Sequence, residues 1–354
     1  MSDSKLLFLM MLVSLAYINL LSVPLFYPSF FIVVFLFFVF KKIKVDLGLI
    51  VLMLLLASSL MIQFLRFDIK LVQTIIYMLL SVLAYILVAG LNFQDLKSIN
   101  NVLTKIVMVF IAIISVDTAL RFIFPSTLVD YSNVAEDLHF YKYKLSYLYL
   151  DSNIVALLLI HLISLRFICA SVNKEKIING LNIILILLLI LTLSRSCIIS
   201  LLVLWGLIKA KDSSIFRIIV APSVIIVIFI VASNLMISDA SGLTKLHELS
   251  SIVSFYRDYS IFDVLFGIGV GFGEEVTGRY VHGIIPKLLI EMGLITTIFY
   301  VFLLLKICKL NVFMYLYLVP MIIAGLSLSF YVVAPYQLVG LAFIKLYLEL
   351  YENS

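Results

Sequence analysis

Charged residues are scarce in this sequence. Asp, Glu, Lys and Arg together make up 13% of the 354 residues, whereas 64% are hydrophobic. An ordinary soluble domain is about one quarter charged and about half apolar. A water-soluble enzyme or binding domain is therefore excluded, and the composition predicts a protein that lies mostly in lipid.

Signatures of metal, disulfide and nucleic-acid chemistry are missing as well. The cysteines Cys169, Cys197 and Cys308 form no CxxC pair, and the four histidines show no HxxH or HExxH spacing. Neither a disulfide framework nor a metal site is therefore expected, and no cofactor is predicted. The net charge of +5 comes from basic residues in short segments rather than a long basic tract, which argues against nucleic acid as a partner.

Long apolar runs are abundant, and many approach the roughly 20 residues that cross a bilayer. They predict an all-α, polytopic integral membrane protein with about 12 transmembrane helices (10–12) in a single helical domain, residues 1–354. The expected spans are 6–23, 25–40, 47–65, 71–92, 102–124, 147–168, 181–194, 196–209, 215–236, 284–305, 312–330 and 338–350.

The distribution of basic residues predicts the orientation of these spans. Lysines and arginines close to span ends favour the cytoplasmic side. Placing the N-terminus in the cytoplasm puts most of them inside, including Lys41, Lys42 and Lys44. We therefore expect both termini to be cytoplasmic and the two long loops, 125–146 and 237–283, to lie on the outer face.

The two outer loops hold most of the polar residues that could carry function. In the larger loop, residues 238–257 have apolar side chains at roughly helical spacing, which predicts a helix that lies in the membrane interface or caps the bundle. The smaller loop leads into a tyrosine-rich segment, 131–149, that suits sugar binding or an aromatic belt. Near it, Arg121 and Asp151 are expected to pair across neighbouring helices.

Arg195 is the first candidate site residue. It lies in the run Leu191-Thr-Leu-Ser-Arg-Ser196, where one apolar helix ends and the next begins. Charged side chains at membrane depth are costly and commonly functional, and a guanidinium fork suits phosphate oxygens. The alternative is an arginine whose side chain reaches the outer interface.

Arg257 is the second candidate. It precedes by ten residues Gly267, the first of four glycines that alternate with apolar residues up to Gly273. Such a glycine-rich loop lets the backbone approach another group closely, but without a strand-helix unit it does not indicate a dinucleotide site. The alternative is that Arg257 pairs with Asp258 or Asp263 at the surface.

His282 is the third candidate. It opens the span expected at 284–305, and histidine titrates near neutral pH and can accept a proton from a hydroxyl. Lys287 and Glu291, four residues apart, share a helix face that is turned away from it. The alternative is a structural histidine at the membrane interface.

The order and spacing of these residues resemble the O-antigen polymerase and O-antigen ligase superfamily, the Wzy and WaaL type membrane glycosyltransferases. In that family a serine-arginine pair follows a span in mid-chain, as Ser194-Arg195 does here. A large periplasmic loop then carries an arginine about ten residues before a glycine, as Arg257 precedes Gly267. The resemblance covers residues 185–305.

The third part of the resemblance is a histidine before the glycine of an ExGxxG-like helix. Here His282 precedes Glu291-Met-Gly293-Leu-Ile-Thr296. Thr296 replaces the second glycine, and Gly283 follows the histidine where the ligases usually have Asn, Ser or Gln. The second departure weakens the ligase assignment, and the ligases are often longer than this chain, so the resemblance favours the polymerase.

The resemblance implies a metal-independent transferase in the inner membrane of a bacterial cell. Its substrate would be an undecaprenyl-pyrophosphate-linked oligosaccharide, polymerised at the periplasmic face in lipopolysaccharide biosynthesis. Membrane lipid and a chain-length regulator protein are the further partners expected. The alternatives are an O-antigen ligase, which transfers the polymer to lipid A-core, and, from a different class, a lipid-linked saccharide transporter or flippase.

The resemblance also implies roles for individual residues. Arg195 and Arg257 would bind the pyrophosphate and neutralise charge as the glycosidic bond breaks. His282 would act as general base toward the acceptor hydroxyl, with Asp258 as its orienting partner. The further substrate-binding residues expected are Tyr256, Arg279 and Lys287.

Overall fold

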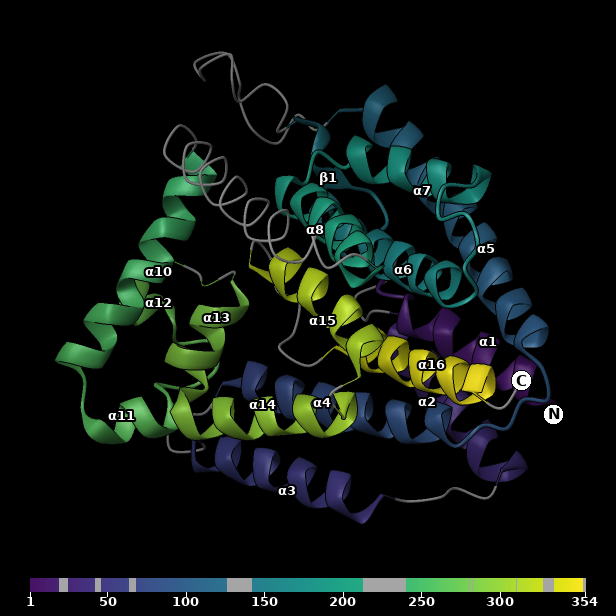
Figure 1. Cartoon of the computed structure of the whole chain (residues 1–354). Helices are drawn as coiled ribbons and strands as arrows, with labels where there is room; N and C mark the ends of the chain where they lie inside the picture. Colours follow the sequence, from purple (N-terminus) through teal and green to yellow (C-terminus); the bar gives the residue numbers. More distant parts are fainter. Residues whose placement is uncertain are drawn as a thin grey trace. The chain divides into compact units, whose positions relative to one another are not determined.

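The fold is all-α, as the composition predicted (Figure 1). The structure is a computed structural model that describes residues 1–18, 25–41, 46–63, 68–125, 142–212, 240–279, 281, 283–309, 311–326 and 334–352. Its contacts divide the chain into two compact units, each assembled from separate stretches of sequence. Unit 1 comprises Met1–Lys44, Ala84–Leu201 and Val339–Ser354, and unit 2 comprises Val45–Leu83 and Leu202–Leu338.

Unit 1 is a helical bundle with one short hairpin. In it α1 packs against α2 and α5, and α7 packs against α5 and α6. The hairpin pairs β1 (Leu145–Ser146) with β2 (Leu150–Asp151) in antiparallel register. The helices are α1 (Asp3–Ser14), α2 (Phe26–Phe40), α5 (Leu96–Ile123), α6 (Ser152–Val172) and α7 (Gly180–Leu191), together with parts of α4 (Ile69–Ala89), α8 (Arg195–Asp212) and α16 (Pro335–Glu352).

Unit 2 contains the glycine-rich loop and the helices around it. Within it α14 packs against α3 and α11, and α10 packs against α12 and α13 (Figure 1). The helices are α3 (Leu47–Met61), α10 (Ala240–Asp258), α11 (Ile261–Phe266), α12 (Glu274–Thr277), α13 (Ile284–Pro286), the π-helical turn η4 (Lys287–Glu291), α14 (Gly293–Cys308) and α15 (Val312–Gly325), together with the remaining parts of α4, α8 and α16.

Side-chain caps fix where several of these apolar helices begin. An Asp or Asn precedes the first residue, and its side-chain oxygen accepts a hydrogen bond from a backbone N–H of the first turn. Because the first N–H groups of a helix have no partner within it, these caps mark the helix starts in otherwise uniform apolar sequence. The capping residues of α3, α5, α6, α7 and α15 are Asp46, Asp95, Asp151, Asn179 and Asn311.

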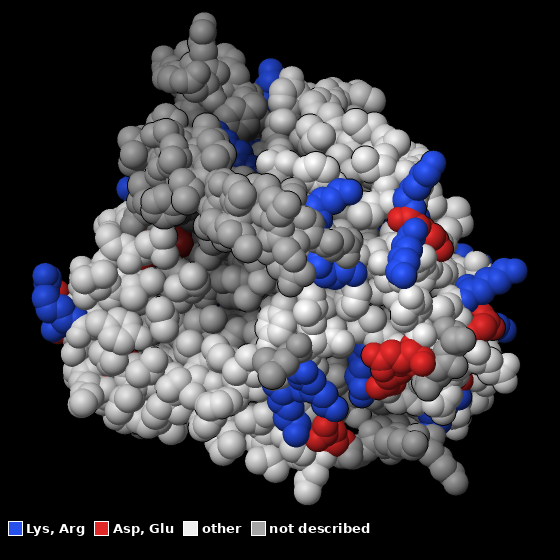
Figure 2. Space-filling model, viewed as in Figure 1, with Lys and Arg blue, Asp and Glu red and all other residues white. Residues whose placement is uncertain are grey.

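Three helices in the described part of the chain are long and apolar enough to cross a membrane: α4, α5 and α6. Several others are apolar but shorter, including α3, α7 and α14. The predicted count of about 12 spans is therefore not supported. Figure 2 shows a mostly uncharged face with Lys, Arg, Asp and Glu gathered in small groups, which fits a protein associated with a membrane.

The span expected at 284–305 is not one continuous helix. It consists of α13, the π-helical turn η4 and α14, and Gly293 at the start of α14 has a φ of +79°. That backbone conformation is left-handed, and glycine adopts it without the steric cost that other residues meet. The continuous helix predicted there is wrong, because an apolar run does not reveal where the backbone must turn aside.

Candidate functional site

The glycine-rich loop and the η4–α14 junction interlock in unit 2. Gly267 (φ +81°) and Gly293 (φ +79°) lie so close that a β-carbon on either would overlap the backbone of the other segment. Backbone hydrogen bonds join the two as well, from Ile268 N to Ile290 O (3.0 Å) and from Gly269 N to Glu291 O (3.2 Å). The group that the glycines approach is therefore the chain's own backbone.

Gln63 secures this junction from the end of α3. Its Nε2 donates to the carbonyl oxygens of Phe266 and Glu291, the latter at 2.9 Å, and its Oε1 accepts from Val270 N at 3.2 Å. Gln63 is buried, and its bonds to Glu291 O and Val270 N are buried as well, whereas the bond to Phe266 O is partly buried. A second link lies one turn away, where Ser59 and Thr296 hydroxyls are 2.9 Å apart.

The loop also encloses the carboxylate of Glu291. The backbone N–H groups of Gly271 and Gly273 donate to it, and the charges of Lys287 and Lys70 act on it. Glu291 is 5% exposed, and a buried carboxylate is tolerated only when it is hydrogen-bonded and compensated by charge. A β-carbon on Gly273 would lie 2.6 Å from Glu291 Oε1, so the alternating glycines make room for this contact.

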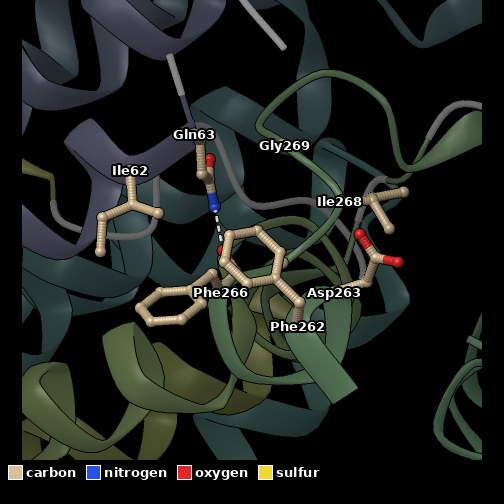
Figure 3. A pocket seen from close by; sticks show the side chains of 8 residues that line it. Ile62, Gln63, Phe262, Asp263, Phe266, Ile268 and Gly269 are labelled. Carbon is tan, nitrogen blue, oxygen red and sulfur yellow. Dashed lines mark hydrogen bonds between the residues drawn. The ribbon is translucent and has the colours of Figure 1, made fainter. Parts of the chain in front are cut away.

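A small open pocket of about 130 Å³ lies beside the interlocked segments. Figure 3 shows Gln63 reaching Phe266 from one side, with the Phe262 ring close by. The lining residues are Ile62, Gln63, Phe262, Asp263, Phe266, Gly267, Ile268 and Gly269. Its largely apolar wall suits a lipid chain or ring face better than a charged group.

Arg257 and Tyr256 lie on the exposed side of α10, in the region predicted to be helical. The Arg257 side chain is 74% exposed, and its Nε and Nη2 donate to the Asp258 carboxylate at 2.7 and 2.8 Å. These hydrogen bonds lower the pKa of the Asp258 carboxyl and raise the pKa of Arg257. The pairing expected as an alternative is thus present, and both groups keep their charge throughout the neutral pH range.

The other expected residues of unit 2 differ in their surroundings. Arg279 is exposed and follows α12, while Lys287 is half-buried at the start of η4 and its charge acts on Glu291. His282 lies outside the described residues, so its role as general base stays a prediction. Its neighbour Gly283 is buried, and its N–H donates to Glu248 Oε2 at 3.1 Å.

Arg195 lies at a sharp break between α7 and α8 in unit 1. Leu193 has a φ of +60°, unusual for a branched side chain, and Ser194 N donates to Thr192 Oγ1 at 3.3 Å. Arg195 is half-buried and begins α8. Arg257 belongs to unit 2, so the meeting of the two arginines at one pyrophosphate stays a prediction.

A buried ion pair near this break departs from the expected pairing. Arg121 pairs with Asp117 on its own helix, Nε to Oδ2 at 3.4 Å, and both side chains are fully buried. Asp151 instead caps α6, accepting from Asn153 N at 2.7 Å. The prediction that Arg121 pairs with Asp151 is therefore wrong, because a partner one helical turn away is held in place by the helix itself.

Two important positions were missed by sequence reasoning. Gln63 and Asp117 are polar residues inside apolar runs, and that placement was an available signal. The partners of Gln63 are distant in sequence, so its role was not readable from the runs alone.

Comparison of the chain with protein-family models, with curated proteins and with solved structures finds no match in any of the three. Its function is therefore argued from the residues and contacts described above. They define a membrane-associated helical protein with exposed basic residues in the same unit as a closely packed junction of two glycine-containing segments.

Proposed function

We propose that this protein is an O-antigen polymerase, a metal-independent membrane glycosyltransferase that joins undecaprenyl-pyrophosphate-linked repeat units at the periplasmic face of the inner membrane. The proposal includes about 12 spans and cytoplasmic termini. The observation that carries it is the interlock of Gly267 with Gly293. Two separate parts of the family resemblance, the glycine ten residues after Arg257 and the Glu-x-Gly segment at 291–293, are thereby in direct contact.

The proposed reaction transfers a glycan from pyrophosphate to a sugar hydroxyl. The acceptor oxygen attacks the anomeric carbon, the bond from that carbon to the phosphate oxygen breaks, and the hydroxyl proton passes to His282. Undecaprenyl pyrophosphate leaves with the bonding electron pair. Arg257, held by Asp258 yet largely exposed, and Arg195 would bind it and offset its growing charge.

Donor binding would extend to the neighbours of Arg257. Tyr256 is 39% exposed beside it on α10, and its ring offers a face for a sugar. Arg279, exposed after α12, offers a third cation for the pyrophosphate. Lys287 would act through Glu291 rather than on substrate directly, since its charge already acts on that carboxylate.

The lipopolysaccharide ladder of a deletion strain tests the assignment. A lost polymerase leaves core bearing a single repeat unit, whereas a lost ligase leaves bare core. Complementation with Arg195→Ala, Arg257→Ala or His282→Ala is expected to leave that single-unit band, with Lys105→Ala as an exposed control that restores the ladder. Long-chain polysaccharide at normal level with all three variants would refute the mechanism.

A further inference from the structure

The end of α7 leaves backbone carbonyls that no helical N–H reaches, as at every helix C-terminus. Two of them are satisfied from other elements of unit 1. Arg121 Nη2 donates to Leu191 O at 3.4 Å, and Ser152 Oγ donates to Thr192 O at 3.0 Å. Both carbonyls belong to the short segment that leads into Arg195.

The Arg121 guanidinium holds more than this carbonyl. Its Nη1 donates to Tyr143 O at 3.2 Å and its Nη2 to Thr118 Oγ1 at 3.3 Å, while Asp117 balances its charge. A fully buried arginine is costly in apolar surroundings. Its planar fork holds five N–H donors on three nitrogens in one fixed geometry, which the three donors on the single nitrogen of a lysine do not reproduce.

Asp117 fixes the neighbouring hairpin in the same way. Its Oδ1 accepts from Ser146 Oγ (2.9 Å), Tyr147 N (2.9 Å) and Leu148 N (3.1 Å). Ser152 N, just beyond the hairpin, donates to Lys144 O at 2.9 Å. One buried ion pair therefore ties the end of α5 to the hairpin and to the α7–α8 break.

We propose that Asp117 and Arg121 are positioning residues that set the backbone of the α7–α8 break and thereby aim Arg195. They touch no substrate in this scheme and act through Leu191 and the hairpin. The inference rests on the proposed function only for what Arg195 binds. Its placement is tested without any activity.

Thiol labelling tests the placement directly. In a chain with Cys169, Cys197 and Cys308 replaced by alanine, Arg195→Cys is labelled with a hydrophilic thiol reagent in detergent. Adding Arg121→Met is expected to raise the labelling rate at position 195 about ten-fold, because a segment that loses its hydrogen bonds opens locally more often. Arg121→Lys, which keeps the charge, should produce a smaller change in the same direction.

A second thiol distinguishes positioning from general loss of structure. Ser254→Cys, exposed on α10 in unit 2, should label at an unchanged rate in the Arg121 variants. An unchanged rate at 195 in both variants would overturn the proposal, and so would an equal change at 254. If Arg121→Met does not accumulate, the labelling rates at 195 and at 254 in Arg121→Lys are compared, and the same outcomes support or overturn the proposal. Failure of the proposed function would appear elsewhere, as a full ladder with Arg195→Ala.

Discussion

Gly267 and Gly293 show how single residues shape unit 2. Each has a positive φ, and a β-carbon on Gly267 would overlap the backbone of Glu291, while one on Gly293 would overlap the backbone of Gly267. Gly278 also has a positive φ, +65°, but nothing lies within 4 Å of its missing side chain. A side chain at Gly278 would therefore meet only the strain of a left-handed backbone, whereas one at Gly267 or Gly293 would meet that strain and a steric overlap.

Alanine should destabilise the protein at each of these glycines, but less at Gly278 than at Gly267 or Gly293. Gly278→Ala pays only the left-handed backbone, about 1–2 kcal/mol. Gly267→Ala and Gly293→Ala also bring the β-carbon to 2.2 Å from backbone atoms, which costs more than the about 1–3 kcal/mol of ordinary overpacking, so they should lower the melting temperature markedly more. Thermal unfolding in detergent measures this, with Gly180→Ala, which has open space around it, as a neutral control. Equal losses at 267 and 278 would contradict the interlock.

The Glu291 carboxylate should stabilise unit 2 through its backbone donors. Glu291→Ala leaves the N–H groups of Gly271 and Gly273 without their acceptor, and a buried donor left unsatisfied costs about 1–3 kcal/mol. A loss of a few kcal/mol in unfolding free energy is expected. Glu274→Ala, an exposed carboxylate on α12, should change stability by less than about 0.5 kcal/mol. Similar effects from both changes would count against the buried role.

Arg257 should affect activity without affecting stability. Its pair with Asp258 is exposed, and solvent screening leaves such a pair with little effect on stability. Loss of a positioned donor from a developing anion costs about 3–4 kcal/mol in the transition state, so Arg257→Ala should slow polymerisation at least about a hundred-fold. Melting temperature and glycan length, measured on the same preparation, check both parts. A parallel fall in melting temperature would mean that Arg257 is structural.

At the level of elements, α10 divides its surface between the interior of unit 2 and an exposed strip. Phe255 and Glu248 are buried within unit 2, whereas Leu249 and Val253 are 41% and 71% exposed. Arg257, four residues beyond Val253, continues the same exposed strip. The helix predicted over 238–257 is confirmed as α10, and its apolar exposed strip fits the predicted placement in a membrane interface.

The hydrogen bonds of Gln63, at the end of α3, should control how often the glycine-rich loop opens. Gln63→Ala removes three hydrogen bonds to backbone groups of the loop and of η4. Hydrogen exchange followed by mass spectrometry is expected to quicken in residues 266–273, while α5 in unit 1 keeps its rate. Ser58→Ala, an exposed change on the same helix, serves as the control. Unchanged exchange in the loop would show that the glycine contacts alone suffice to hold it.

At the level of the whole molecule, the apolar surface is the main determinant of environment. The exposed large hydrophobic residues include Phe31, Ile32, Phe35 and Phe38 on α2, and such density is unstable in water. Together with α4, α5 and α6, they explain why so little of the chain is charged.

Membrane topology provides the test at this scale. The protein should remain in the membrane pellet after alkaline carbonate extraction. Reporter fusions at Met1 and Ser354 should both report the cytoplasm, because basic residues near span ends favour that side. A reporter inserted after Ser254 should instead report the periplasm. Termini on opposite sides would require an odd number of spans and a different placement of the proposed site.

The all-α class and the preference for lipid could be predicted from composition and apolar runs, because both act locally and need no partner. The same sequence indicated Arg195 and Arg257 and predicted a helix at α10. The contact of Gly267 with Gly293, and the hydrogen bonds of Gln63 to both segments, became visible in the folded chain, since they link segments distant in the sequence. The helix expected at 284–305 is interrupted for the same reason. Where the glycine-rich loop approaches this segment, the backbone takes a left-handed conformation at Gly293, and an apolar pattern does not indicate such a turn.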